Sequence, residues 1–222
     1  CIRDRNIGAY GVEIKDIFVS CSGYFLNTLE KKKFELNDCQ FSYRSSIFKK
    51  SLRNKFIITE VVLQLSKTNH KITKSYKSIN DALNNKKIHN PTIKDIARIV
   101  SKIRENKLPN PSLIGNSGSF FKNPIVSIEL LNKLKQKFSK LVYFKESVSK
   151  YKLSAAWLIE NCNFKNIEEK NVGVYKNQAL VIINLGNATG KEILLFSEKI
   201  KSKVLEKFDI LLLFFEQDIK FF

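Results

Sequence analysis

The chain has 222 residues, 43% of them hydrophobic, which is typical of a folded globular protein rather than a disordered one. Its 39 Lys and Arg against 21 Asp and Glu give a net charge of +18, a balance that raises nucleic acid as a partner. The lysines are scattered, however, without regularly interleaved aromatics, and A/T-rich codon bias also explains them. We therefore expect no specific nucleic-acid binding.

Four cysteines and two histidines are spread along the chain. They form no C-x-x-C pair and no zinc-type spacing, so the sequence predicts no metal site and requires no disulfide. Uncharged stretches such as 179–190 are too short to span a bilayer. We expect a cytoplasmic protein without a membrane partner. The absence of Met, even at position 1, predicts a processed form or a fragment of a longer chain.

The first half begins with strand-like segments. Residues 12–19 and 55–65 are β-branched and partly alternating, and residues 37–46 between them are polar and turn-prone. Two helices are expected to follow. The clearer one begins near Thr92, an N-cap candidate, and places on one face Ile93, Ile96, Val100 and Ile103.

The prolines of Lys107–Pro111 end that helix and predict a domain junction. In the second half, Ser127 can cap a helix, and a further helix is expected at 154–161. A hairpin is predicted at 172–185 and an amphipathic helix at 187–207. The tail is strand-like, and the whole pattern predicts the α+β class with two domains.

The segment Gly115–Pro124 reads Gly-Asn-Ser-Gly-Ser-Phe-Phe-Lys-Asn-Pro. Gly and Asn allow positive φ at little cost, so the backbone can approach a ligand closely. The turn presents the Ser119 hydroxyl beside two apolar rings, a plausible place to deliver a proton. These ten residues closely resemble the proton-donor loop of the UDP-N-acetylenolpyruvoylglucosamine reductase family, flavin enzymes of cell-wall precursor synthesis.

The resemblance covers nearly the whole chain. The run Asn6, Ile7, Gly8, Ala9, Tyr10 and Gly11 resembles the flavin-lining segment of that family, although most runs of this kind are simply turns. The run Tyr43–Lys49 resembles its arginine motif. The resemblance implies that Arg44 binds the enolpyruvyl carboxylate, because guanidinium and carboxylate form bidentate pairs. The alternative for Arg44 is an ordinary surface arginine in a polar loop.

Substrate contacts are implied at five further positions, namely Tyr76, Lys107, Asn123, Tyr143 and Gln178. Lys107 matches best, and it could equally complement the dipole at a helix C-terminus. Tyr143 suggests the subfamily whose substrate domain carries a tyrosine loop.

The family's third catalytic group is an acid on the final strand, and here the chain departs from the pattern. Matching the tail places Asp218 in that position, whereas a different register places Glu216 there. Both lie on the same strand face, so only one register aims a carboxylate well. A terminus without a competent acid is the remaining alternative.

The resemblance implies that residues 1–108 are the remainder of an FAD-binding domain and 109–208 a small substrate-binding domain. Residues 209–222 would then be a terminal strand that returns to the FAD-binding region. Because the first flavin-binding elements of the family precede Cys1, the chain is expected to be N-terminally truncated.

The implied reaction is the reduction of UDP-N-acetylglucosamine enolpyruvate to UDP-N-acetylmuramate in peptidoglycan synthesis. NADPH would reduce FAD, and hydride would pass to the β-carbon of the enolpyruvyl ether. Arg44 would stabilise the resulting negative charge, and Ser119, with Lys107 as a neighbouring cation, would protonate the α-carbon. The expected partner is a nucleotide sugar, and the expected state a monomer. The alternatives are an inactive remnant of this reductase and a basic nucleic-acid-binding module.

Overall fold

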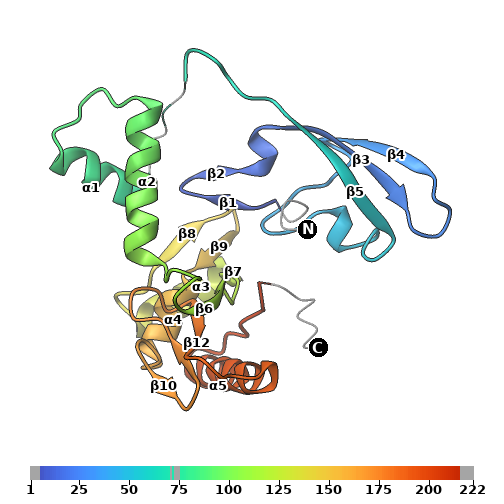
Figure 1. Ribbon diagram of the computed structural model, residues 1–222. Helices are drawn as coiled ribbons and strands as arrows, with labels where there is room; N and C mark the ends of the chain where they lie inside the picture. Colours follow the sequence, from blue (N-terminus) through green and yellow to red (C-terminus); the bar gives the residue numbers. More distant parts are fainter. Residues whose placement is uncertain (1–5, 71, 73–75, 216–222) are drawn as a thin grey trace. The chain divides into compact units, whose positions relative to one another are not determined.

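The computed structural model describes residues 6–70, 72 and 76–215, and it divides into two compact units, 1–101 and 102–222. Both units mix helices and strands, so the predicted α+β class is confirmed (Figure 1). The division falls inside a long helix, before the junction expected at 108. The three domain ranges assigned from the sequence stay a prediction.

Unit 1 contains an antiparallel sheet in the order β4-β3-β5. Its strands are β3 (Phe18–Phe25), β4 (Lys31–Glu35) and β5 (Phe56–Leu63). A short 3₁₀ helix, Ile47–Lys49, packs its apolar residues against one face of this sheet. The resulting core consists of Phe18, Cys21, Phe34, Cys39, Ile47 and Phe48.

A small hairpin precedes this sheet. It consists of β1 (Gly8–Ala9) and β2 (Val12–Glu13), joined by Tyr10 at φ 54° and Gly11 at φ 85°. Two central residues with positive φ are what a type I′ hairpin turn requires. The single strand predicted over 12–19 is wrong, because a 3₁₀ helix, Ile14–Asp16, interrupts it. The Asp16 carboxylate accepts a hydrogen bond from the Glu13 amide at 2.7 Å and caps that helix.

Unit 1 continues into α1 (Lys77–Asn85) and α2 (Ile93–Lys107). The Thr92 N-cap is confirmed, since its hydroxyl accepts from the Asp95 amide at 3.3 Å. The predicted face of α2 is confirmed in part, because Ile96, Val100 and Ile103 are partly buried. Ile99 is buried, whereas Ile93 in the first turn is half exposed.

Unit 2 contains two small antiparallel sheets, in the orders β10-β11-β12-β6 and β7-β9-β8. The strands are β6 (Gly115–Ser119), β7 (Ile125–Ser127), β8 (Tyr143–Lys145), β9 (Lys150–Leu153), β10 (Glu168–Glu169), β11 (Val172–Val174) and β12 (Val181–Asn184). The helices are α3 (Ile128–Lys137), α4 (Ala155–Asn161) and α5 (Gly190–Phe208). The predicted hairpin and three helices of this half are therefore confirmed.

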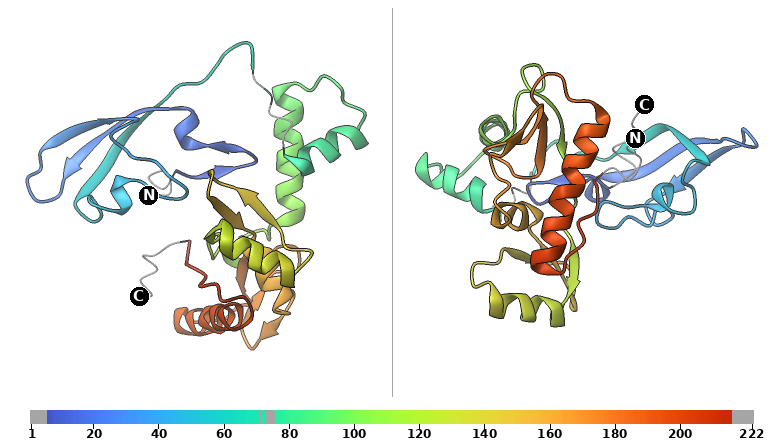
Figure 2. Two further views of the ribbon diagram at one scale, coloured as in Figure 1. Left: turned by 180° about the vertical axis from the view of Figure 1, so that it is seen from behind. Right: turned by 90° about the horizontal axis from the view of Figure 1, so that it is seen from below.

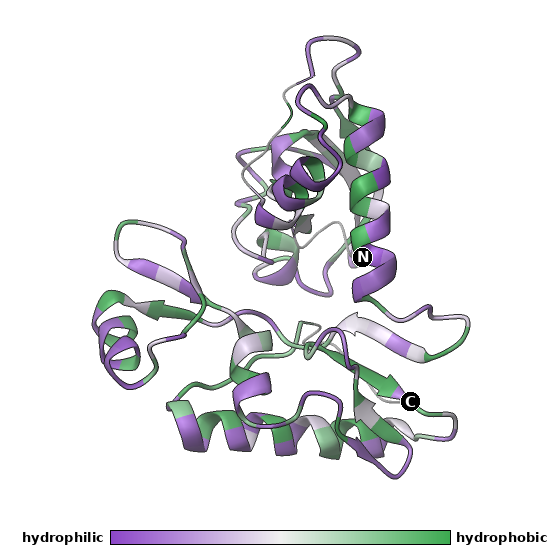
Figure 3. Cartoon of the chain, turned by 90° about the vertical axis from the view of Figure 1, so that its left-hand side faces the viewer, coloured by the Kyte–Doolittle hydropathy of each residue, from purple (hydrophilic) through white to green (hydrophobic). Residues whose placement is uncertain are grey.

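The helices of unit 2 begin at side-chain caps. The hydroxyls of Ser127, Ser154 and Thr189 accept from backbone amides in the first turns of α3, α4 and α5. The long helix α5 lies against β11 and β12 (Figure 2). Hydrophobic and hydrophilic residues are interspersed along α2 and α5 (Figure 3), as expected for helices with one buried face.

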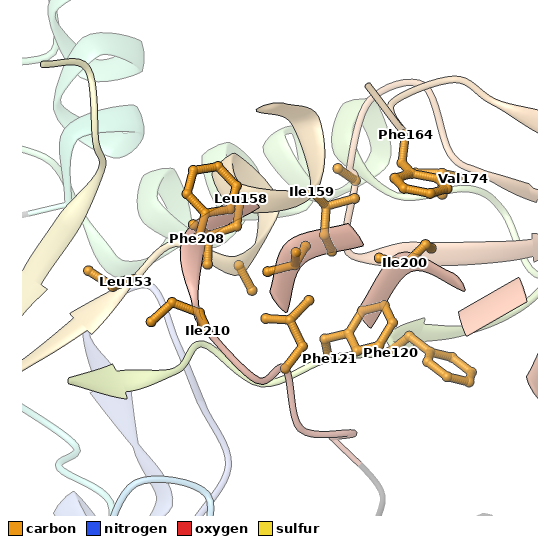
Figure 4. Close-up of a cluster of buried hydrophobic side chains, with 14 of the residues drawn as sticks. Phe120, Phe121, Leu153, Leu158, Ile159, Phe164, Val174, Ile200, Phe208 and Ile210 are labelled. Atoms are coloured by element: carbon orange, nitrogen blue, oxygen red, sulfur yellow. The ribbon is translucent and has the colours of Figure 1, made fainter. Parts of the chain in front are cut away.

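The core of unit 2 gathers apolar side chains from α4, α5, both sheets and the segment after β6 (Figure 4). Phe121 and Ile200 are almost fully buried in it. The segment 210–215 after α5 runs beside the residues that follow Ser119. The Phe215 amide donates to the Phe120 carbonyl at 2.8 Å, and the Lys122 amide donates to the Leu213 carbonyl at 2.8 Å. This pairing packs the Phe120 and Phe121 rings against Phe214.

Candidate functional site

The arginine predicted to bind a carboxylate lies at the tip of a tight turn. Ser42 and Ser45 exchange backbone hydrogen bonds of 3.0 and 3.1 Å, which leaves Tyr43 and Arg44 as the two loop residues. Arg44 has φ 52°, a left-handed conformation that non-glycine residues adopt mainly in turns. The Arg44 side chain is only 15% exposed, so it is not an ordinary surface arginine.

The guanidinium of Arg44 contacts the predicted flavin-lining segment. Nη1 donates to the Asn6 carbonyl at 3.1 Å, and Nη2 donates to the Gly8 carbonyl. Two motifs that are far apart in the sequence are therefore brought together in unit 1. The Glu13 carboxylate is 3.9 Å from Nη1.

Asn6 is fully buried and joins several parts of this region. Its side-chain amide donates to Glu13 Oε2 at 2.9 Å and to the Ser42 carbonyl at 3.2 Å. Its side-chain oxygen accepts from the Lys15 amide at 3.1 Å. The side chain thus connects the start of the flavin-lining segment to the arginine turn and to the 3₁₀ helix. Sequence reasoning missed Glu13, because nothing local distinguishes this carboxylate from others on alternating strands.

The rest of the flavin-lining segment forms the hairpin. Ile7 accepts a hydrogen bond from the Ile14 amide at 2.8 Å, while Ala9 and Gly11 are exposed at the tip. A Cβ on Gly8 would lie 2.7 Å from the Val12 carbonyl oxygen, so the hairpin itself requires glycine there. The turn interpretation and the cofactor prediction are compatible, because an exposed tip leaves backbone available to a ligand.

An apolar cavity of about 310 Å³ lies beside this tip. Ala9, Tyr10 and Val12 line it from the hairpin, and isoleucine and valine side chains line it from α1 and α2. The Tyr10 ring meets the Tyr76 ring edge-on at a centroid distance of 5.1 Å. The predicted substrate residue Tyr76 therefore lies next to the predicted cofactor segment.

Ser119 ends β6 in unit 2, directly after a β-bulge. Ser119 pairs with Val181 and Asn116 with Ile183, so β6 has one more residue than β12 over this interval. Gly118 has φ 74°, and the Asn116 side chain accepts from its amide at 3.0 Å. Bulges reorient the side chains that follow them. Ser119 is exposed beside the buried rings of Phe120 and Phe121, as the sequence predicted.

Lys107 and Gln178 lie on elements that are joined to one another and to β6. Lys107 is the last residue of α2, and its neighbour Asn106 accepts a hydrogen bond from the Asn177 side chain at 2.9 Å. Gln178 is in the same turn, and the strand that begins at Val181 pairs with Ser119. The contact made by Asn177 was not predicted, and its only sequence signal is its place beside Gln178.

Asn123 and Tyr143 flank a different part of unit 2. The Asn123 side chain accepts from the Ala155 amide at 2.9 Å, which satisfies a free donor at the start of α4. Tyr143 pairs with Leu153 across β8 and β9, and its ring lies under the Lys135 ammonium at 5.3 Å. Both acid candidates, Glu216 and Asp218, lie outside the described residues.

The described part of the chain contains no cluster of three or more His, Cys, Asp and Glu side chains suited to a metal ion. None of its helices is long and apolar enough to cross a membrane.

Both units belong to the α+β class. Arg44 lies in a tight turn at φ 52°, and Ser119 follows Gly118 at φ 74°. The fold of the chain is similar to the crystal structure of UDP-N-acetylenolpyruvylglucosamine reductase (MurB) from Thermus caldophilus, with a TM-score of 0.59 and 17% identity over 97% of this chain and 58% of that one. The family model for the C-terminal domain of UDP-N-acetylenolpyruvoylglucosamine reductase matches residues 110–220. The chain therefore belongs to the UDP-N-acetylenolpyruvoylglucosamine reductase family.

Curated relatives that carry this name match most of this chain in sequence. The Flavobacterium johnsoniae reductase is 47% identical over 206 residues, which are 93% of this chain and 61% of the relative. The Amoebophilus asiaticus reductase is 42% identical over 94% of this chain and 61% of the relative. The Pseudomonas fluorescens (strain Pf0-1) reductase is 38% identical over 93% of this chain and 60% of the relative. The chain thus spans about three fifths of the length of these relatives.

Proposed function

We propose that this chain is part of an FAD-dependent, NADPH-consuming reductase that converts UDP-N-acetylglucosamine enolpyruvate to UDP-N-acetylmuramate for peptidoglycan synthesis. The observation that carries the proposal is the contact between Arg44 and the carbonyls of Asn6 and Gly8. The side chain expected to bind the substrate carboxylate is thereby attached to the segment expected to line the flavin. Family membership supports the same reaction.

The residues of unit 1 fit one wall of a flavin site. The hairpin tip exposes Ala9 and Gly11, and the cavity beside it is apolar, which suits the edge of a planar ring system. Residues 6–11 would hold the cofactor through backbone contacts. When bound, FAD reduced by NADPH supplies the hydride for the enolpyruvyl double bond.

This chain's own residues would bind the substrate and move one proton. Arg44 would bind the carboxylate and stabilise the negative charge that develops on it, which is often the largest catalytic contribution. The Ser119 hydroxyl would donate a proton to the α-carbon. A serine hydroxyl is a weak acid, so the Lys107 ammonium would assist by stabilising the developing alkoxide.

The remaining predicted residues would bind and orient the nucleotide sugar. Tyr76, Asn123, Tyr143 and Gln178 would contact it, and the carboxylate of Glu216 or Asp218 would orient the reacting group. The protein would act in the cytoplasm as a monomer.

The test joins this chain to the portion of the Flavobacterium johnsoniae reductase that it does not match. We expect a yellow protein whose flavin is reduced by NADPH and reoxidised anaerobically by the enolpyruvyl substrate. Ser119→Ala should slow the reoxidation by at least a hundredfold, on the order of the contribution of general acid catalysis. A folded, flavin-loaded chimera without substrate-driven reoxidation would favour the inactive remnant instead.

A further inference from the structure

The two oxygens of the Glu13 carboxylate are used differently. Oε2 accepts the hydrogen bond from the buried Asn6 amide at 2.9 Å and pairs with the Lys15 ammonium at 3.0 Å. Oε1 faces Arg44 Nη1 at 3.9 Å, which is beyond hydrogen-bond distance. Glu13 therefore acts on Arg44 through its charge, while the carbonyls of Asn6 and Gly8 accept the hydrogen bonds.

This division of roles suits an arginine that must also bind a ligand. A guanidinium that is mostly removed from water is stabilised by nearby negative charge, and the Glu13 carboxylate is one such charge beside Arg44. A carboxylate in bidentate contact with Arg44 would compete for the donors that a substrate carboxylate needs. At 3.9 Å, Glu13 Oε1 adds negative charge near Nη1 without accepting a hydrogen bond from it.

Glu13 also stabilises the segment that carries the acceptors for Arg44. It pairs with Gly8 across the β1–β2 hairpin, and its side chain bonds to Asn6. Both carbonyls that accept hydrogen bonds from Arg44 thus belong to residues that contact Glu13, Gly8 by strand pairing and Asn6 by a side-chain hydrogen bond. A substitution of Glu13 would therefore affect the Arg44 guanidinium in two ways. It would change the nearby charge, and it would change the position of the backbone carbonyls that accept from Arg44.

We propose that Glu13 is a positioning residue that sets the orientation of the Arg44 guanidinium for the carboxylate of the substrate. The inference rests on the proposed function, since Arg44 is assigned to that carboxylate there. Glu13 touches neither the substrate nor the cofactor in this proposal. Its effect therefore falls on the half-reaction that uses Arg44.

The first experiment needs no activity and uses the chain as it is. NMR spectra of the ¹⁵N-labelled protein should show slowly rotating Nη groups for Arg44, assigned by their loss in Arg44→Lys. Glu13→Gln keeps an acceptor for Asn6 but removes the charge, and it should broaden or merge these signals. Glu35→Gln is the matched control, because Glu35 pairs with Lys33 on β4, and it should leave them unchanged. Unchanged Arg44 signals in folded Glu13→Gln would overturn the inference.

The second experiment separates the half-reactions in the flavin-loaded chimera by stopped flow. Glu13→Gln should slow reoxidation by the enolpyruvyl substrate about tenfold or more, in line with the cost of small displacements at a reacting centre. Reduction by NADPH should stay within twofold of the parent. Glu13→Asp, which keeps the charge but shortens the side chain, should be intermediate in reoxidation and serves as the second variant if Glu13→Gln does not fold.

The outcomes separate the two proposals. A parent chimera that binds flavin but shows no substrate-driven reoxidation would contradict the proposed function. The NMR comparison would still test whether Glu13 restricts the Arg44 guanidinium. An active parent in which Glu13→Gln leaves reoxidation unchanged would overturn the role of Glu13 alone. Equal slowing of both half-reactions would also overturn it, because a general loss of structure would then explain the defect.

Discussion

Nη1 of Arg44 donates a hydrogen bond of 3.1 Å to the backbone carbonyl of Asn6, 38 residues earlier in the chain. Together with the bond from Nη2 to Gly8, this contact makes the arginine turn and the N-terminal hairpin one structural element. The planar fork of a guanidinium suits two neighbouring carbonyls, whereas an ammonium group cannot reproduce that geometry. The contact therefore bears on stability as well as on substrate binding.

Replacing Arg44 by Lys should lower the free energy of unfolding by about 1.5–3 kcal/mol, the range for hydrogen bonds to charged groups. Urea denaturation followed by circular dichroism measures this change. Arg104→Lys is the control, because Arg104 is exposed near the end of α2 and should cost less than about 0.5 kcal/mol. Equal effects of the two substitutions would contradict the assigned role of the Arg44 contacts.

Replacing Gly118 by Ala tests the backbone that presents Ser119. No atom lies within 4 Å of the added Cβ, so the cost comes from φ 74° and should be about 1–2 kcal/mol. Gly186→Ala also adds a Cβ with nothing within 4 Å, at φ 139°, a conformation that residues with side chains adopt even less readily. Both variants should lose stability in urea denaturation, but only Gly118→Ala should slow substrate-driven flavin reoxidation in the chimera. Equal reoxidation rates would show that the bulge does not orient Ser119 for the reaction.

Replacing Asn177 by Ala should loosen the turn that carries Gln178. The lost hydrogen bond to the Asn106 carbonyl is worth about 0.5–1.5 kcal/mol at most, so the global stability should change little. Hydrogen exchange with mass spectrometry should show faster exchange at the end of α2 and in the 175–180 turn. The exposed neighbour Lys176 provides the control, since Lys176→Ala should leave this exchange pattern unchanged.

The N-cap of α5 predicts a pH dependence of stability. Hydrogen bonds from the amide and hydroxyl of Thr189 lower the pKa of Glu192 below its usual value of 4.5. Because the folded-state pKa is the lower one, this contribution is complete above the unfolded pKa and is lost as the pH falls through the folded pKa. Urea midpoints between pH 7 and pH 3 should therefore fall less steeply in Glu192→Gln than in the parent. Parallel curves would contradict the coupling.

The thiol of Cys162 offers a second pH-dependent test. Burial raises its pKa above the usual 9.0, so the reactive thiolate is scarcer at pH 8 than in a free cysteine. Alkylation of Cys162 by iodoacetamide, followed by peptide mass spectrometry, should be slower than in the urea-unfolded chain and should still be rising at pH 9. A rate that levels off below pH 8.5 would contradict the raised pKa.

Local chemistry made several features predictable. Thr92 and Ser127 carry hydroxyls at positions where a helix needs an acceptor for its first amides, and both act as N-caps. The α+β class follows from strand-like and helical patterns that alternate along the chain. The exposed place of Ser119 beside two buried rings also follows from its immediate neighbours, because Gly118 permits the positive φ of the bulge and the phenylalanines require burial.

Other features depend on side chains that meet from distant positions. The apolar pattern over 12–19 suggested one strand, but Asp16 caps the 3₁₀ helix there, and the buried Asn6 bonds to the adjoining Lys15 amide. On α2, periodicity predicted the side that faces inward, since Ile96, Val100 and Ile103 are partly buried. The sequence did not show that Ile99 is the buried residue of the helix and that Ile93 in its first turn is half exposed.

The sequence by itself determined the fold class, the starts of α2, α3 and α4 and the membership of a reductase family, because caps, turns and motifs act over a few neighbouring residues. Only the tertiary structure decided that Arg44 bonds to Asn6 and Gly8, that Glu13 faces its guanidinium, and that Asn177 bonds to the end of α2. These contacts join residues from separate turns. Their geometry depends on how the intervening chain packs, which no local pattern encodes.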